Sequence, residues 1–325
     1  MKNGSEIYFL VYQSRSGSTY LSKLLNQNNY VSVTPEADFN YSFIYKNRIL
    51  KNKNEISAVI DEFFKSKKSK SWNFSKKELG EELLKLDYPI TFSDFFYTIL
   101  DLHYKENRPK NIVFKGVFPN KIPHIKRQFT ESKFILISRD FRAVYNSQVN
   151  TINFNTGRPM SKNPFLASLE YRLLNNFIDT YKEKSFFHHV TYEKLIFDHE
   201  NILSKIYLFM KVENAADLNQ DYILSLSKEH KNIHSNVNKP PQKIRIEAWK
   251  KELNPIFIYI IQSLASKSLI LNKYKLQHVD LNLFHKFNLL LFFIRFISQP
   301  IKFYVVLKDF FKLRYHSFFQ MKDVR

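Results

Sequence analysis

Five short runs of apolar and β-branched residues constrain the fold of this chain more than any other feature. The runs are IYFLVY (7–12), YVSVT (30–34), NIVFKG (111–116), KFILIS (133–138) and FFHHVTY (186–192). Longer segments with helical spacing lie between them, as at Leu21, Leu24 and Leu25. Buried strands that alternate with helices are typical of a mostly parallel sheet covered on both faces. We therefore predict a three-layer α/β sandwich that binds ligands at the carboxyl ends of its strands.

The composition narrows the class of protein. The 325-residue chain has no cysteine, which excludes disulfides, zinc fingers and thiol catalysis. Its net charge of +20 favours an anionic partner, although a lysine-rich composition can also reflect genome bias. The basic residues are spread out rather than clustered with aromatic platforms, so nucleic acid is not expected. The N-terminal stretch MKNGSEIYFLVYQ does not read as a signal peptide, and we expect a cytoplasmic protein.

The connection between the second and third runs, residues 37–108, is long enough to hold a helical insert. It carries the lysine-rich stretch FFKSKKSKSWNFSKK and a capping box in which Ser75 is followed by Glu78. We expect the insert to lie over the ligand-binding edge and to select a substrate. A solvated helical decoration is the alternative.

Residues 281–325 form a tail that differs from the main domain, residues 1–280. The tail holds 10 of the 32 phenylalanines and eight Lys or Arg against two Asp. Its longest apolar run, LLLFFI, is too short to span a bilayer. Phenylalanines interleaved with basic residues favour an amphipathic helix in a membrane interface. Packing on the main domain or on a second subunit remains the other interpretation.

The stretch YQSRSGSTYL falls between the first predicted strand and the first predicted helix. A turn at this position directs backbone N–H groups toward one point, and the helix dipole adds positive potential there. Arg15 supplies a cation, the neighbouring hydroxyls supply donors, and Gly17 allows close approach of the backbone. The loop is thus suited to a tetrahedral anion. It lacks the first glycine and the lysine of the ATP-binding pattern G-x-x-x-x-G-K-[ST].

A second candidate anion site follows the fourth strand. Arg139 leaves the end of that strand, and Ser147 lies eight residues later, about two helical turns along. An arginine and a hydroxyl at this separation can close on one anion. Two such sites on one sheet edge predict a nucleotide that is phosphorylated at two positions.

These motifs resemble those of the sulfotransferases that use 3′-phosphoadenosine-5′-phosphosulfate (PAPS). SRSGSTYLSKLL is similar to their 5′-phosphosulfate loop, and ILISRDFRAVYNS is similar to their 3′-phosphate motif. The likeness continues through IVFKGVFPNKI and VTYEKLIFDHENILSKIYLFMKV and covers roughly residues 6–275. The RSGST form is closest to the carbohydrate and bacterial branches. The resemblance implies the sulfotransferase fold, which is like that of the P-loop nucleotide hydrolases.

The resemblance also implies roles for individual residues. Arg139 and Ser147 would hold the 3′-phosphate, with Arg245 as a weaker candidate from a late loop. Phe141 stands where the family commonly has proline, which would only preset the first helical turn. The residues that would cradle the 5′ end are Arg15, Ser16, Gly17, Ser18, Thr19 and Tyr20.

Transfer of a sulfuryl group to a hydroxyl needs a base and a cation near the leaving phosphate. Glu36, directly after the second strand, is expected as the base, since carbohydrate and bacterial relatives commonly use a glutamate in this region. Asp38 is the nearby alternative as base. Glu36 could instead be an ordinary surface glutamate at the start of a helix, without a catalytic role. Lys115 ends the third strand, where the resemblance places a lysine that meets the sulfuryl group; a salt bridge at the sheet edge is its alternative role.

The sequence therefore predicts in-line sulfuryl transfer from PAPS, without a metal, to a hydroxyl of a carbohydrate or glycolipid. The tail would hold the enzyme on the inner face of an anionic membrane. A nucleotide-dependent kinase on the same fold is an alternative, which the missing G-K-[ST] disfavours. A non-catalytic basic membrane-binding relative is another. The neighbouring His188 and His189 point to opposite faces of a strand and do not form a metal site.

Overall fold

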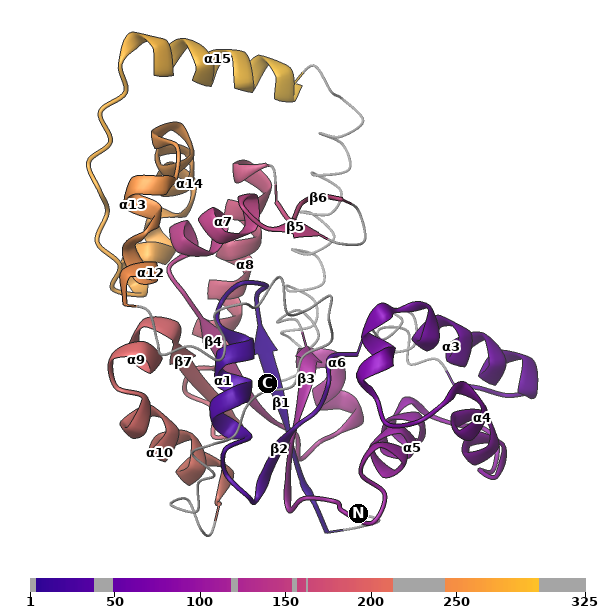
Figure 1. The fold of residues 1–325 in the computed structure, drawn as a ribbon. Helices are drawn as coiled ribbons and strands as arrows, with labels where there is room; N and C mark the ends of the chain where they lie inside the picture. The colour runs from indigo at the N-terminus through magenta and orange to yellow at the C-terminus, as the bar shows by residue number, and fades with distance from the viewer. Residues whose placement is uncertain are drawn as a thin grey trace.

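The centre of the computed structural model, which describes residues 4–37, 49–117, 122–153, 157–161, 163–212 and 243–297, is a parallel sheet (Figure 1). Its five strands follow the order β2-β3-β1-β4-β7. Each predicted strand is confirmed, with bounds within one residue of those expected. The strands are β1 (Glu6–Tyr12), β2 (Val31–Val33), β3 (Asn111–Val117), β4 (Lys133–Ser138) and β7 (Phe187–Thr191).

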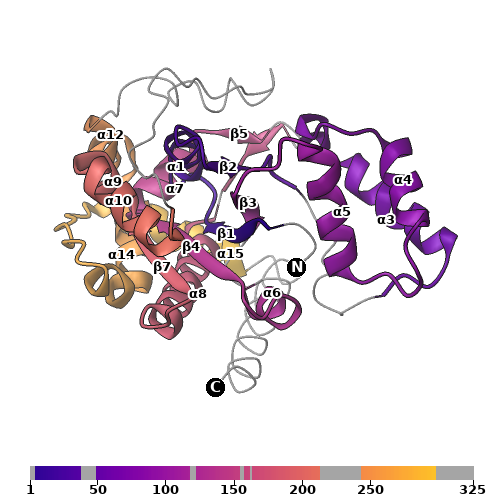
Figure 2. The same cartoon turned by 90° about the horizontal axis from the view of Figure 1, so that it is seen from below.

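Alternate residues of the central strand β1 face two separate cores. Tyr8 and Leu10 pack with the helices that cover one face of the sheet, while Phe9 and Val11 pack with those on the other. Figure 2 shows the sheet between these two helical layers. The expected three-layer α/β sandwich is therefore confirmed. The first layer contains α1 (Ser18–Leu25), α9 (Tyr192–Phe197) and α10 (His199–Met210), and the second contains α6 (Ile122–Gln128) and α8 (Pro164–Tyr181).

The connection between β2 and β3 forms the expected helical insert, which lies beside the β2–β3 edge (Figures 1 and 2). The predicted capping box is present, because the Ser75 hydroxyl accepts from the Glu78 N–H and the Glu78 carboxylate accepts from the Ser75 N–H. Helix α5 joins the insert to the sheet through the rings of Phe96 and Phe114, whose centroids are 4.9 Å apart. The described elements are α3 (Lys53–Lys65), the 3-10 helix η1 (Lys67–Ser71), α4 (Lys76–Leu84) and α5 (Phe92–Tyr104).

Phe141, the residue that replaces the family's usual proline, begins α7 (Phe141–Val149), two residues beyond the turn residue Arg139 that follows β4. Its side chain is fully buried, and its ring stacks on Tyr171 of α8 with a centroid distance of 4.8 Å. The aromatic residue therefore fixes the start of the helix by packing rather than by backbone restriction. The hairpin β5 (Ile152–Asn153) and β6 (Arg158–Pro159) follows, and the later helices are α12 (Ile244–Glu247), α13 (Trp249–Glu252) and α14 (Pro255–Leu271).

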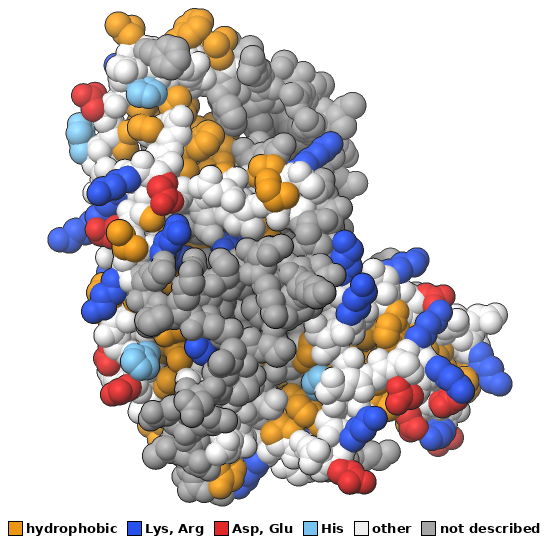
Figure 3. Space-filling model, viewed as in Figure 1, with side chains coloured by type: hydrophobic (Ala, Val, Ile, Leu, Met, Phe, Trp, Pro, Cys, Tyr) orange, Lys and Arg blue, Asp and Glu red, His pale blue; other side chains and the backbone are white. Residues whose placement is uncertain are grey.

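The tail begins with α15 (Leu283–Ile297), and its residues 298–325 lie outside the described residues. Leu281, just before the helix, is buried against Ile256 and Ile260 of α14. Other side chains are exposed, including Leu283 and Phe287, and Figure 3 shows hydrophobic side chains gathered at this end of the molecule. In the described part of the chain, no single helix meets the length and hydropathy of a membrane span, although the sharply bent pair Ile244–Glu252 and Pro255–Leu271 does so jointly.

Candidate active site

The loop after β1 requires glycine at its centre. Gly17 is the N-cap residue of α1 and has a φ of 100°, a region that side chains disfavour. A Cβ atom at Gly17 would lie 2.2 Å from the ring of Tyr192, far inside contact distance. Arg15 also has a positive φ, of 73°. The loop is thus tightly wound, with Tyr192 of α9 packed against it.

The two predicted anion sites meet at the edge of the sheet, because β1 and β4 are neighbours. The Arg15 Nε atom donates to the Ser147 hydroxyl at 2.9 Å, and the Arg139 guanidinium lies 3.5 Å from the Arg15 carbonyl oxygen. The Arg139 guanidinium also stacks over the Tyr192 ring at 4.4 Å from its centroid. Burial, and then the positive charge of Arg139, lower the pKa of Arg15. The arrangement brings two guanidinium groups close together, and a bound anion would reduce the repulsion between them.

Two polar atoms of this cluster have no hydrogen-bond partner among the described residues. They are the Ser16 hydroxyl oxygen and the Arg139 Nε atom, both of which are buried. A buried polar atom without a partner destabilises a protein by about 1–3 kcal/mol. Ser18 and Thr19 are also buried at the start of α1, and Tyr20 is partly buried against the same layer. The residues present therefore fit a phosphate-bearing ligand.

A bulge in β3 positions the third candidate region. The β1–β3 register shifts between Leu10 and Val11, and Gly116 there has a φ of 125°. A Cβ atom on Gly116 would lie 2.9 Å from the carbonyl oxygen of Ala37. The chain that follows β2 therefore passes directly over this glycine, which brings Glu36 to the end of β3.

Glu36 lies between two lysines from different parts of the chain. Its carboxylate is 3.1 Å from Lys115 Nζ at the end of β3 and 3.2 Å from Lys68 Nζ in the insert. Lys115 Nζ also donates to the Thr19 hydroxyl at 3.2 Å, so it links the phosphate loop to Glu36. The Trp72 Nε1 atom donates to the Glu36 carbonyl oxygen at 3.2 Å. The candidate base, the candidate cation and the loop thus adjoin.

Opposing effects determine the pKa of Glu36. Burial raises it, but the charges of Lys115 and Lys68, together with hydrogen bonds from Lys115 and Tyr12, lower it further than burial raises it. The net pKa is well below the usual range of a glutamate. The carboxylate is therefore ionised at neutral pH, and it is a weak base while both lysines contact it.

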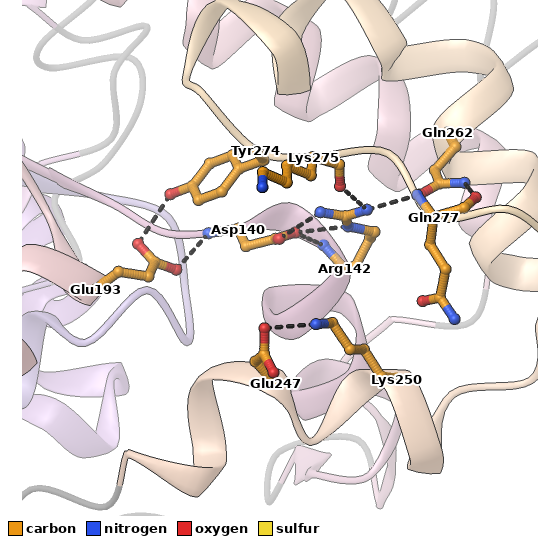
Figure 4. Close-up of polar contacts among 9 residues, drawn as sticks. All are labelled: Asp140, Arg142, Glu193, Glu247, Lys250, Gln262, Tyr274, Lys275 and Gln277. Atoms are coloured by element: carbon orange, nitrogen blue, oxygen red, sulfur yellow. Dashed lines mark hydrogen bonds and ion pairs between the residues drawn. The ribbon is translucent and has the colours of Figure 1, made fainter.

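A buried polar network fixes the turn that carries Arg139 (Figure 4). The next residue, Asp140, forms an ion pair with Arg142 at 2.7 Å, and Arg142 Nη1 donates to the carbonyl oxygen of Lys275 at 2.9 Å. Glu193 accepts from the Asp140 N–H and from the Tyr274 hydroxyl, both at 2.9 Å. Burial is the main cause that raises the pKa of Glu193. Residues 274–275, after α14, therefore brace the second anion site.

Two weaker candidates have different outcomes. The Arg245 carbonyl oxygen accepts from Arg139 Nη2 at 2.7 Å, while the Arg245 guanidinium lies 3.7 Å from the carboxylate of Glu252. Arg245 thus contacts the site through its backbone, and its proposed role at the 3′-phosphate stays a prediction. Asp38, the alternative base, lies outside the described residues. The expectation of a metal-free reaction also stays a prediction; within the described ranges no three His, Asp or Glu side chains gather as a metal site would require.

Sequence reasoning missed three residues that the structure places at the site. Tyr192 belongs to the VTYEKL turn that carried part of the resemblance, so its position could have been inferred. Lys68 lies in a lysine-rich run with nothing to distinguish it from its neighbours, and Trp72 follows four residues later. Their contacts with Glu36 span more than thirty residues of sequence.

Comparison with known proteins defines the class to which this fold and site belong. The sequence matches the model of the sulfotransferase family over residues 9–217, which is more than half of the chain. The chain therefore belongs to the sulfotransferase family, and the expected membership is confirmed. No curated protein sequence matches the chain.

Two solved structures share the fold. A sulfotransferase domain from the curacin biosynthetic pathway superimposes with a TM-score of 0.55 at 18% identity and covers 85% of this chain and 100% of its own. A sulfotransferase domain of the Synechococcus PCC 7002 olefin synthase gives a TM-score of 0.53 at 16% identity and covers 85% of this chain and 98% of its own. The sulfotransferase fold predicted from the sequence is confirmed.

Proposed function

We propose that this sulfotransferase uses PAPS as donor and transfers the sulfuryl group to a hydroxyl of a carbohydrate or glycolipid. One observation supports the donor most strongly: the Arg15–Tyr20 loop adjoins Arg139 and Ser147, and the buried Ser16 hydroxyl and Arg139 Nε have no hydrogen-bond partner within the described ranges. A nucleotide with a phosphosulfate at one end and a phosphate at the other supplies the missing acceptors. A donor with a single phosphate leaves one of the two sites unused.

In the proposed reaction, the bond between sulfur and the oxygen of the 5′-phosphate breaks as the acceptor oxygen bonds to sulfur from the opposite side. Negative charge develops on the leaving phosphate, and the N–H groups at the start of α1 stabilise it. Lys115 lies between Thr19 of the loop and Glu36, a position suited to contact with the group in transit. Glu36 accepts the proton of the acceptor hydroxyl.

The ion pairs of Glu36 imply that donor binding activates the base. Oxygen atoms of a phosphosulfate in the loop compete with Glu36 for the Lys115 ammonium group. Each positive charge that moves away from the carboxylate raises the pKa of Glu36, and a carboxylate with a higher pKa is a more effective base. The donor would therefore prepare the base before the acceptor reacts.

The acceptor class has weaker support than the donor. A carbohydrate or glycolipid is favoured by the RSGST form of the loop, by a glutamate as base, and by a tail suited to a membrane surface. Leu283, Phe287 and Leu290 of α15 are exposed in a helix that also carries Lys286. Insertion of such side chains into the inner face of an anionic membrane would bring the site to lipid-linked acceptors.

Calorimetric titration with adenosine 3′,5′-bisphosphate (PAP) tests the donor. We expect a micromolar or tighter Kd without added metal, and Arg139→Ala should weaken it about 100-fold, because truncation of a buried charged contact removes about 2–5 kcal/mol. Binding of ATP with magnesium but not of PAP would favour the kinase alternative. PAP binding without sulfation of any extracted glycan or glycolipid would favour the non-catalytic alternative.

Sedimentation with vesicles tests the membrane contact. Wild-type protein should sediment with phosphatidylserine-containing vesicles, and Phe287→Asp combined with Leu290→Asp should remain in solution while it retains PAP affinity. Equal sedimentation of both proteins would exclude this helix as the contact. Comparison of sulfated glycans and lipids between cells with and without the gene would then identify the acceptor.

A further inference from the structure

The insert holds Glu36 at two points, one on the side chain and one on the backbone. Lys68 Nζ lies 3.2 Å from the carboxylate, and Trp72 Nε1 donates to the Glu36 carbonyl oxygen at 3.2 Å. Both residues come from η1 and the residue that follows it. One short segment of the insert thus contacts both the carboxylate and the backbone of Glu36.

This segment is anchored in the core of the insert. The Trp72 side chain is only 4% exposed, and its ring contacts Phe63 and His103 with centroid distances of 6.0 and 4.9 Å. Ser69, within η1, is also buried. The Lys68 side chain, by contrast, is 26% exposed and extends from this buried segment toward the Glu36 carboxylate. An anchored backbone with a partly exposed ammonium group is suited to orient a partner.

The two lysines that contact Glu36 come from different parts of the fold. Lys115 belongs to the sheet and also contacts Thr19 of the phosphate loop. Lys68 belongs to the insert that lies beside β2. When an anionic donor draws Lys115 toward the loop, the ion pair with Lys68 still holds the carboxylate from the insert side.

We propose that Lys68 is a positioning residue that orients Glu36 and keeps it ionised as the donor withdraws Lys115, so that the insert takes part in sulfuryl transfer. The inference rests on the proposed function for its chemical meaning. The ion pair itself can be tested without it. The described groups that face the carboxylate are Lys68 from η1, Lys115 from β3 and the Tyr12 hydroxyl from β1.

Carboxyl NMR gives a readout that does not depend on activity. Protein labelled with carbon-13 at the glutamate carboxyl is titrated between pH 4 and 8, and Glu36→Gln identifies the Glu36 signal. In Lys115→Met, the remaining pair with Lys68 should keep Glu36 ionised through this range. In the double variant with Lys68→Met, burial is opposed only by the Tyr12 hydrogen bond among the described groups, and the apparent pKa should rise by about 1–3 units relative to Lys115→Met.

Matched variants separate this role from a general effect of charge. Lys70→Met, an exposed lysine of the same 3-10 helix, should leave the Glu36 titration unchanged in the Lys115→Met background. Lys68→Arg should restore the titration of the Lys115→Met single variant. Identical titration of Glu36 with and without Lys68, or an equal shift from Lys70→Met, would overturn the proposal.

Kinetics test the role in the reaction, with octyl glucoside as a glycolipid-like acceptor and with Lys115 intact. Lys68→Met should lower kcat about 10- to 100-fold, the loss expected when a reacting group is misplaced. The KM for PAPS should stay within about twofold, and the acid limb of the pH profile should move to higher pH. A loss of PAP affinity equal to the loss in kcat would show that Lys68 acts on the donor and would refute the proposal. Absence of PAP binding in the wild type would instead refute the proposed function and leave the NMR result standing.

Discussion

The two halves of the candidate site are built in opposite ways. The donor half consists of the loops after β1 and β4, neighbouring central strands, and it leaves the Ser16 hydroxyl and Arg139 Nε without partners in the part of the chain that the structure describes. The base half consists of Glu36, Lys115 and Lys68, whose charged groups already pair with one another. The donor half is thus preorganised for an external anion, while the carboxylate of the base half already has its ion-pair partners within the protein.

Because of this difference, the donor half should determine ligand affinity and the base half should determine folding stability. A buried polar group that awaits a ligand contributes to affinity but disfavours folding, because its burial without a partner costs free energy. A buried carboxylate between two lysines contributes to folding, because its removal leaves positive charge uncompensated. Substitutions in the two halves should therefore affect different measurements.

The largest effect is expected at Gly17, where the donor half meets the packed core. In Gly17→Ala, the new methyl group would clash with the Tyr192 ring at a backbone conformation that disfavours side chains. We expect a loss of about 2–5 kcal/mol in the free energy of unfolding, measured with urea, and no detectable PAP binding. Gly157→Ala is the control, because Gly157 has a φ of 63° but open space around it. Equal destabilisation of both variants would show that backbone strain, and not the Tyr192 contact, is responsible.

Glu36→Gln should give the next largest change, and in stability as well as activity. The variant leaves the buried Lys115 without its carboxylate, so the free energy of unfolding at pH 7 should fall by about 1–3 kcal/mol. Because the native pKa of Glu36 is lowered, this contribution is present above the usual glutamate pKa and is lost as acid protonates the carboxylate. Glu82→Gln, which removes a surface pair with Lys85, should change stability by less than about 0.5 kcal/mol. A Glu36→Gln protein as stable as the wild type would show that these ion pairs do not stabilise the fold.

His103, which packs against Trp72 near the base half, makes the folding stability depend on pH. Burial lowers the pKa of His103 to about 4, and its ring contacts Trp72. The unfolded chain therefore binds more protons than the folded one between pH 4 and 6.5, and stability falls as the pH is lowered through this window. Thermal unfolding at pH 7 and pH 5 measures this loss of stability. The loss between the two pH values should be about 1–2 kcal/mol smaller in His103→Gln than in the wild type. The exposed His199 provides a control that should behave as wild type, and a wild-type slope in His103→Gln would contradict the assignment.

The smallest effect is expected at Ser16. Ser16→Ala removes a buried hydroxyl that has no partner among the described residues, so PAP affinity should fall about 10-fold while the free energy of unfolding should not fall. Ser22→Ala should show the reverse, because the Ser22 hydroxyl donates to the Ser18 carbonyl oxygen within α1. Calorimetry and urea denaturation on both variants measure the contrast. Loss of stability without loss of affinity in Ser16→Ala would remove Ser16 from the donor site.

The contrast also explains which features the sequence could predict. The strands, the YQSRSGSTYL loop and the placement of Arg139 and Ser147 beside that loop follow from short contiguous segments with strong local patterns, because parallel topology brings such strand ends to one edge. Lys68 and Trp72 depend on how the insert folds back onto Glu36, and no local pattern specifies that contact. The Arg142 network is similar, because Gln262 and Lys275 lie more than a hundred residues away. Phe141 shows a further limit, since a residue noted as a departure from the family is part of the core.

The edge position of β2 has a consequence for how enzymes of this kind diversify. The strand is three residues long, pairs only with β3 in the described sheet, and is followed by the segment that carries Glu36 toward the insert. A segment attached at a sheet edge can be lengthened, shortened or exchanged without disturbing β1 and β4. On the proposed function, remodelling this one peripheral segment would change the surroundings of the acceptor, provided that the new segment again supplied contacts to the Glu36 carboxylate.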